Sequence, residues 1–114
     1  MLKVAAAQIR VINDTEKNLD KIIYYIKKAA SKNVDIICFP ETSLIHSKNK
    51  KAIKRIPIKN YINIIKKSCR ENKIHCIFGT NVLERNKIYN SSFLIDDTGN
   101  VIYRYDKVNL WLTE

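Results

Sequence analysis

The chain of 114 residues has few of the residues that interrupt regular structure, with only 2 Gly and 2 Pro. Together with the lack of repeats, this scarcity excludes low-complexity and repeat architectures. No apolar run approaches the ~20 residues that a membrane-spanning helix needs. The N-terminus passes straight into a strand pattern, without the layout of a signal peptide. We therefore expect a soluble, cytoplasmic domain, or part of one, over residues 1–114.

Cysteine is also scarce, with 3 residues at Cys38, Cys69 and Cys76. The odd count and these spacings match no zinc or redox motif, so we expect neither a metal nor another cofactor. Cys38 and Cys76 lie inside apolar runs, and Cys69 lies on the apolar face of a helical pattern. These positions predict buried, unreactive thiols.

Acidic residues are few, 11 against 21 Lys and Arg, and the formal net charge is +10. A basic chain raises the question of nucleic-acid binding. The densest basic run, residues 48–55, contains no Gly and no aromatic residue. Lysine also dominates arginine, whereas proteins that recognise phosphates and bases favour arginine. We interpret the run as a solvated loop, and we do not expect nucleic acid as the partner.

The order of the apolar patterns predicts an α/β fold. Strand patterns cover residues 2–9, 35–39 and 74–80. Amphipathic helices are expected between them, from 15 to a left-handed cap at Asn33 and from Pro57 to a cap at Asn72. Two further strands, 87–95 and 101–105, flank a turn cluster and form a hairpin. The expected result is a mixed sheet with helices covering one face.

Two charged residues follow strands that the pattern predicts to be buried. Glu41 comes directly after the strand that Pro40 ends, and Lys107 closes the last strand-like stretch. Open α/β sheets keep their chemistry at the carboxyl edge of the strands, where a partly desolvated carboxylate is a usable base and a lysine can stabilise an oxyanion. The alternative is a loop glutamate and a solvated lysine. We predict that the two charged groups lie within roughly 4–8 Å of each other.

Several motifs, taken in order, resemble the N-terminal half of the nitrilase superfamily, the carbon–nitrogen hydrolases. The strongest match is residues 35–42, DIICFPET, which in the family carries the catalytic glutamate, and residues 99–110 resemble the segment with the catalytic lysine. The resemblance thus implies catalytic roles for Glu41 and Lys107, and a fold that is half of an α-β-β-α sandwich. Shorter matches are residues 3–8, Asn18, residues 78–79 and residues 89–91.

The family works with a Glu–Lys–Cys triad, and its nucleophilic cysteine follows the lysine. Here all three cysteines precede Lys107, and Thr113 is the one nucleophile candidate after it. Asp106 and Asn109 stand where the family commonly has Arg and His. The resemblance offers Glu114 as the counterpart of a second active-site glutamate. We therefore expect a chain that provides the base and the cation without the nucleophile.

Three hypotheses follow for residues 1–114. The first is a carbon–nitrogen hydrolase domain truncated before the nucleophile segment and inactive alone, and the second is half of a split enzyme completed by a C-terminal half. The third is a noncatalytic basic module that binds a partner or nucleic acid. The family implies small nitrile, amide or carbamoyl substrates and homo-oligomers, and the sequence does not choose among the substrates. Half of a sandwich also predicts uncovered apolar surface and therefore self-association.

Overall fold

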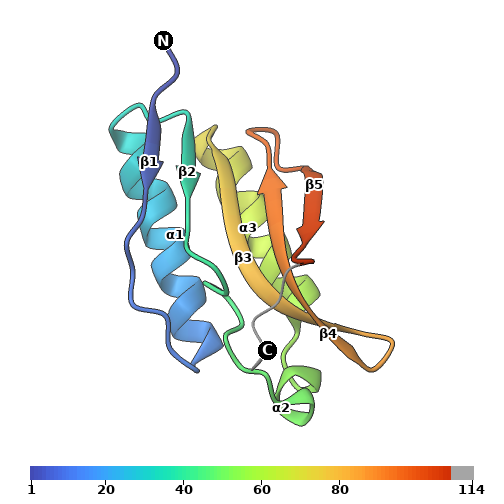
Figure 1. Ribbon diagram of the computed structural model, residues 1–114. Helices are drawn as coiled ribbons and strands as arrows, with labels where there is room; N and C mark the ends of the chain where they lie inside the picture. Colours follow the sequence, from blue (N-terminus) through green and yellow to red (C-terminus); the bar gives the residue numbers. More distant parts are fainter. Residues whose placement is uncertain (109–114) are drawn as a thin grey trace.

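The computed structural model describes residues 1–108, and no helix among them is long and apolar enough to cross a membrane. The elements are β1 (Val4–Ala6), α1 (Thr15–Ser31), β2 (Ile36–Cys38), α2 (Lys50–Lys54), α3 (Ile58–Asn72), β3 (His75–Glu84), β4 (Lys87–Ile95) and β5 (Val101–Asp106). The strands form one sheet in the order β1-β2-β3-β4-β5 (Figure 1). The first three strands are parallel and the last three are antiparallel. The predicted mixed α/β sheet is confirmed.

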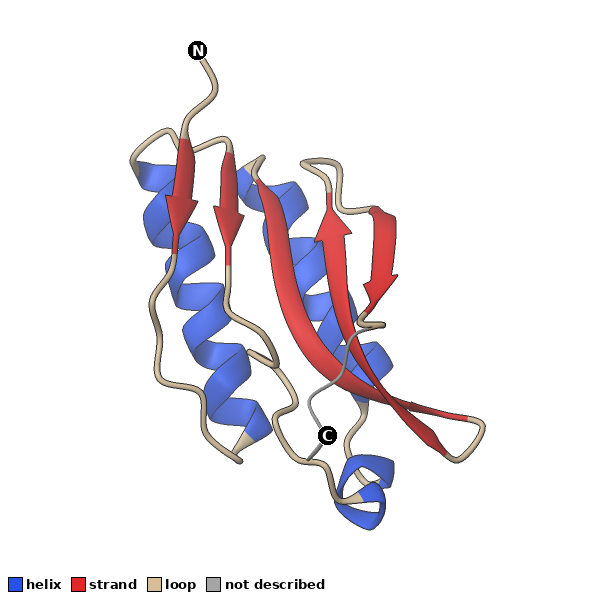
Figure 2. Ribbon diagram, viewed as in Figure 1, coloured by secondary structure: helices blue, strands red, loops and turns tan. Residues whose placement is uncertain are grey.

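The two long helices, α1 and α3, lie on the same face of the sheet, as predicted (Figure 2). Helix α1 begins after Asp14, whose side chain accepts a hydrogen bond from the backbone of Lys17. Asn33 follows its end with φ of 58°, the expected left-handed conformation. At the end of α3 the left-handed residue is Lys73, with φ of 52°, and not the predicted Asn72. The Asn72 amide donates instead to the Ser68 carbonyl within the last turn.

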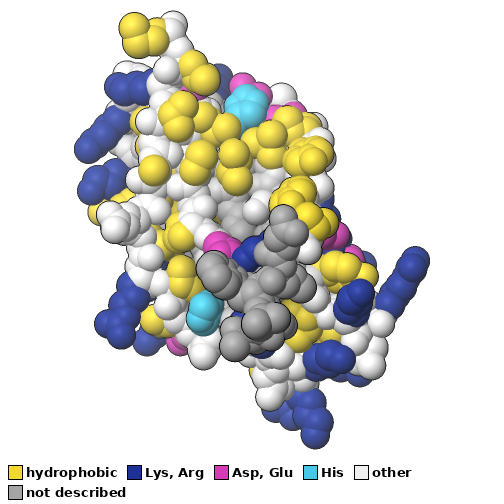
Figure 3. Space-filling view, in the orientation of Figure 1, with side chains coloured by type: hydrophobic (Ala, Val, Ile, Leu, Met, Phe, Trp, Pro, Cys, Tyr) yellow, Lys and Arg dark blue, Asp and Glu magenta, His cyan; other side chains and the backbone are white. Residues whose placement is uncertain are grey.

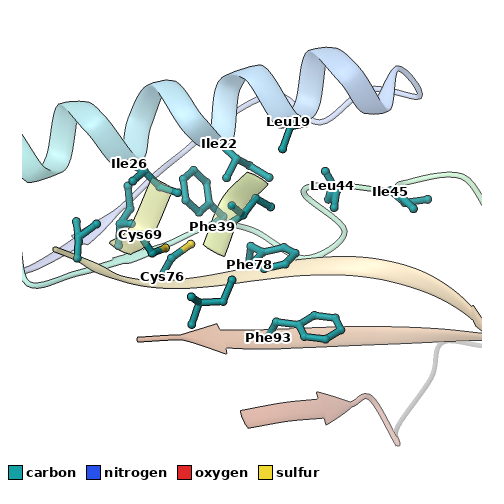
Figure 4. Close-up of a cluster of buried hydrophobic side chains, with 14 of the residues drawn as sticks. Leu19, Ile22, Ile26, Phe39, Leu44, Ile45, Cys69, Cys76, Phe78 and Phe93 are labelled. Atoms are coloured by element: carbon teal, nitrogen blue, oxygen red, sulfur yellow. The ribbon is translucent and has the colours of Figure 1, made fainter. Parts of the chain in front are cut away.

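The hydrophobic core lies between these helices and the covered face of the sheet (Figure 4). Ile22 and Ile26 of α1 are fully buried in it, as is Phe78 of β3. Phe78 stacks on Phe93 of β4 with ring centroids 5.4 Å apart. The core therefore joins the parallel strands to the hairpin.

The cysteines differ in burial. Cys69 and Cys76 are buried in the core, as predicted, and burial raises the pKa of the Cys76 thiol well above its ordinary value. The prediction was wrong for Cys38, which is half-buried. Because neighbouring strand residues alternate, β2 turns Ile37 into the core and Cys38 toward the opposite face.

Three boundaries differ from the prediction for local reasons. Strand β1 is shorter than residues 2–9, because β2 offers it only three partner residues. Strand β3 continues past residue 80 to Glu84, which pairs with the first residue of β4. The two residues between the strands, Arg85 and Asn86, both have positive φ, as tight hairpin turns require. Helix α2 lies in the segment predicted to be a loop, and Asn49 caps it by accepting from the backbone of Ala52.

The other face of the sheet carries apolar side chains that no helix of residues 1–108 covers. Val4 is 57% exposed, and Tyr103 and Tyr105 of β5 are 61% and 45% exposed. Figure 3 shows hydrophobic side chains gathered on this side of the molecule. We call it the open face. It is the exposed apolar surface that the sequence predicts.

We expect the 114-residue chain, expressed alone, to self-associate despite its net charge of +10, because a large exposed apolar patch drives association. Size-exclusion chromatography measures this, together with a denaturation curve. Replacing both Tyr103 and Tyr105 by Lys should shift the chain toward monomer. Tyr24→Lys, on the exposed side of α1, is the control that should not. A monodisperse unmodified monomer with one cooperative transition contradicts the prediction.

Candidate active site

Glu41 lies in a tight turn that directly follows β2. Pro40 ends the strand, because proline has no amide hydrogen for the ladder. Thr42 then adopts φ of 52°, which is unusual for a β-branched residue and reverses the chain. Its hydroxyl lies 2.9 Å from Nδ1 of His46. The turn therefore presents the Glu41 side chain at the carboxyl edge of the parallel strands.

The segment after Glu41 is fixed against β3 by backbone hydrogen bonds. The Leu44 amide donates to the Gly79 carbonyl at 3.0 Å, and the Asn81 amide donates to the Ile45 carbonyl at 3.0 Å. The buried Ser43 hydroxyl lies 3.2 Å from both the amide nitrogen and the carbonyl oxygen of Gly79. This turn is thus an extension of the sheet and not a free loop.

Asn18 of α1 anchors the same turn from the helix side. Its side chain is fully buried, and its amide donates to the carbonyls of Ile12 and Leu44 at 2.6 and 2.9 Å. Its side-chain oxygen accepts from the Ile12 amide at 3.2 Å. A buried amide with both ends satisfied stabilises the segments it joins. Asn18 therefore connects the chain after β1 to the turn after Glu41.

Lys107 reaches the same place from β5, the outer strand on the hairpin side of the sheet. Its backbone amide donates to the Asn90 carbonyl at 2.8 Å, which continues the pairing of β5 with β4. Strand β5 is largely exposed and not buried as the sequence pattern indicated. The lysine side chain is nevertheless only 25% exposed. Because β5 runs in the same direction as β2, both strands end at the same edge.

Glu41 and Lys107 meet directly, with Nζ of the lysine 3.1 Å from Oε1 of the glutamate. The predicted approach is confirmed, and the contact is closer than the expected 4–8 Å. The glutamate side chain is 55% exposed, so a reacting group can reach it. The pair joins a potential proton acceptor to a cation across 66 residues of sequence.

A third residue, Asn90 of β4, completes the cluster. Its side-chain amide donates to Oε1 of Glu41 at 2.5 Å. The residues Glu41, Thr42, His46, Lys48 and Asn90 line a hollow of about 140 Å³ beside the pair. In the sequence, residues 89–91 form a motif match that by itself predicts no role for Asn90. The signal that marked it was a polar amide in the middle of a strand.

Asp106, which precedes the lysine, belongs to a separate ion network. It accepts from the Ser91 hydroxyl at 2.6 Å and from Nε of Arg104 at 2.9 Å, and both interactions lower its carboxyl pKa. Arg104 also donates two hydrogen bonds to Glu84 and holds the pKa of that carboxyl below its ordinary value. As predicted from strand alternation, Asp106 and Lys107 contact different partners on different sides of the sheet.

The remaining predicted residues fall outside the described part of the chain. These are Thr113, Asn109 and Glu114, the proposed second carboxylate. Among residues 1–108, no group of three or more His, Cys, Asp and Glu side chains could hold a metal ion. The described site therefore consists of a carboxylate, an ammonium group and an amide.

Known proteins share both the sequence pattern and the fold. A "Hydrolase in agr operon" from Staphylococcus aureus is 28% identical over 116 residues, which is 96% of this chain and 43% of that protein. The NitN amidase from Nesterenkonia sp. AN1 has a TM-score of 0.85 at 18% identity, over 97% of this chain and 46% of that one. A variant of that amidase, with the acetamide moiety of fluoroacetamide added covalently at its active-site cysteine, has a TM-score of 0.84 at 17% identity, over 96% and 44%.

The chain spans less than half the length of these relatives. The structural likeness at such low identity establishes the fold. The sequence model of the carbon-nitrogen hydrolase family matches residues 3–114, nearly the whole chain. The chain therefore belongs to the carbon-nitrogen hydrolase family.

Proposed function

We propose that this chain supplies the general base and the cation of an enzyme that hydrolyses non-peptide carbon–nitrogen bonds in small amide, carbamoyl or nitrile substrates. The nucleophile in this proposal is a cysteine on a segment outside residues 1–114. One observation carries the proposal: Nζ of Lys107 lies 3.1 Å from Oε1 of Glu41, at the edge where an open α/β sheet holds its chemistry.

In this proposal the two carboxylate oxygens of Glu41 have different tasks. Oε1 accepts from both Lys107 and Asn90. Within residues 1–108 no hydrogen bond engages Oε2, which leaves that oxygen to take the proton of an approaching thiol. A base must lie within hydrogen-bond reach of the proton that it abstracts. In the proposal the nucleophile therefore approaches the exposed side of Glu41.

For an amide substrate the reaction runs in two stages. Glu41 removes the thiol proton, and the thiolate attacks the carbonyl carbon. The Lys107 ammonium stabilises the oxyanion of the tetrahedral intermediate. Glu41 then returns the proton to the leaving nitrogen, which departs as ammonia or an amine. In the second stage Glu41 activates a water molecule that hydrolyses the thioester and releases the acid.

The chain's own cysteines do not fit the nucleophile's task. Cys69 and Cys76 are fully buried, and burial keeps the Cys76 thiol protonated by raising its pKa. Cys38 is half-buried on β2, and in the described part of the chain no hydrogen bond joins a cysteine to Glu41. The Nesterenkonia amidase carries an active-site cysteine, and this chain covers only 44% of its length, which supports assigning the task to a segment outside residues 1–114.

We expect the purified 114-residue chain to hydrolyse acetamide, an N-carbamoyl amine or a nitrile no faster than background, because loss of a nucleophile removes most of an enzyme's rate enhancement. Adding the polypeptide encoded directly beyond codon 114, in the same chain or co-expressed, should restore turnover. Ammonia release measures both results.

Two controls separate the alternatives. Alkylating Cys38, Cys69 and Cys76 should change nothing in the isolated chain, and turnover that alkylation abolishes would place the nucleophile within it. Adjoining DNA that encodes no cysteine at a tight turn after a strand would overturn the proposal. That result would leave the basic interaction module as the function of the chain.

A further inference from the structure

Asn90 touches both members of the charged pair, through different groups. Its backbone carbonyl accepts from the amide of Lys107 at 2.8 Å. Its side-chain amide donates to Oε1 of Glu41. The backbone of Asn90 thus fixes the position of the Lys107 backbone, and the side chain of Asn90 contacts the Glu41 carboxylate.

We propose that Asn90 is a positioning residue that holds the Glu41 carboxylate against Lys107 and orients its second oxygen toward the nucleophile. The catalytic meaning of this role rests on the function proposed above. Asn90 acts through Glu41, and no contact of Asn90 with substrate is part of the proposal.

The ion pair alone is too weak to hold Glu41 in place. The glutamate side chain is 55% exposed, and exposed ion pairs contribute only about 0–1 kcal/mol, less than long side chains lose when they are ordered. A second donor from a β-strand, whose backbone is fixed on both sides, adds directional restraint at the same oxygen. With both donors on Oε1, the carboxylate has one defined orientation.

The register of the hairpin shows that the turn is held by a pair of asparagines. Asn90 lies directly opposite Asn81 of β3. The side-chain amide of Asn81 donates to the backbone carbonyls of His46 and Ser47, at the far end of the turn that begins with Glu41. Two cross-strand asparagines therefore hold the two ends of this turn. The Asn81 side chain bonds backbone carbonyls of the turn, and the Asn90 side chain bonds the Glu41 carboxylate.

Asn is suited to this position by charge as well as by shape. Its amide donates to a carboxylate without carrying a positive charge that would compete with Lys107. An aspartate of the same size would place a second negative charge beside Glu41 and attract the lysine away from it. Asn90→Asp thus retains the volume of the side chain and removes the donor, which separates positioning from simple packing.

The test measures the contact between Nζ of Lys107 and the Glu41 carboxyl carbon by magic-angle-spinning NMR, which requires neither a monomeric nor a soluble sample. Lysine is labelled with ¹⁵N at Nζ and glutamate with ¹³C at the carboxyl group. The other Lys–Glu ion pair of the described residues, Lys67–Glu71, is removed by Lys67→Arg in every sample. The signal is the dephasing of the ¹⁵N resonance by a nearby ¹³C carboxyl carbon. Glu41→Gln removes the label at position 41, so the dephasing lost in this variant is the part that Glu41 causes.

We expect Asn90→Ala and Asn90→Asp to lose most of the Glu41-dependent dephasing. Asn63→Ala, at an exposed position of α3, should retain all of it. An unchanged carboxyl chemical shift of Glu84, which pairs with Arg104 across the sheet, verifies that each variant is folded. Full dephasing in Asn90→Asp would overturn the proposal, because the side chain would then act by volume alone. The readout involves no catalysis, so its failure is distinct from a failure of the proposed function.

Discussion

Replacing Glu41 by Gln should lower kcat by about 10²–10⁴-fold, the usual contribution of a general base. The measurement uses the chain together with the segment that supplies the nucleophile. The Gln side-chain oxygen can still accept from Asn90 and Lys107, so the turn should retain its geometry. The amide nitrogen that replaces Oε2 cannot take a proton from a thiol or a water molecule. The loss should therefore appear in kcat, with KM little changed, when ammonia release is followed against substrate concentration.

A second ion pair in the same chain provides a matched control. Glu71 and Lys67 on α3 are paired at 3.7 Å, and both side chains are more than half exposed. Glu71→Gln should leave kcat unchanged, which shows that removing a carboxylate is not harmful in itself. Lys107→Met should lower kcat by about 10²–10³-fold, as expected for loss of an oxyanion-stabilising group. Wild-type kcat in Glu41→Gln would contradict the assignment of the base.

The parts of the site that follow from local sequence were predictable. The apolar run before Pro40 and the strand pattern before Lys107 placed both charged residues at strand ends. The rule that open sheets hold their chemistry at the carboxyl edge predicted that the two residues lie together. The prediction holds because β2 and β5 run in the same direction. The family resemblance added their roles and drew attention to Asn18.

The parts that depend on tertiary pairing were not predictable. Asn90 reads as an ordinary strand residue until the register with β3 and the return of β5 are known. Helix α2 is only five residues long, too short for a helical period to be distinguished, although Asn49 offered a cap signal. The exposure of Cys38 depends on which residues of β2 face the helices, and an unbroken apolar run has no alternation that would show this.

The placement of the Glu41 turn also depends on the glycine at position 79. A Cβ atom at Gly79 would lie 2.7 Å from the Thr42 nitrogen and 3.1 Å from both Cα of Glu41 and the carbonyl oxygen of Pro40. All three are backbone atoms, so no side-chain rotation can relieve the contact. Real Cβ atoms essentially never approach other atoms as closely as 2.7 Å. The turn and β3 can therefore be this close only with glycine on the strand.

We expect Gly79→Ala to push the turn off β3 and to weaken the bond from the Leu44 amide to the residue 79 carbonyl. Overpacking of this kind costs about 1–3 kcal/mol, which corresponds to roughly 5–150-fold faster exchange of a locally protected amide. Hydrogen exchange at Leu44 and Asn81 measures it, and the Glu41–Lys107 dephasing should fall in the same sample. Ala6→Ser adds one atom at an exposed strand position and should change neither. Wild-type protection of Leu44 in Gly79→Ala would show that the turn does not depend on this close approach, and that another contact, such as the Asn18 amide on the Leu44 carbonyl, positions Glu41.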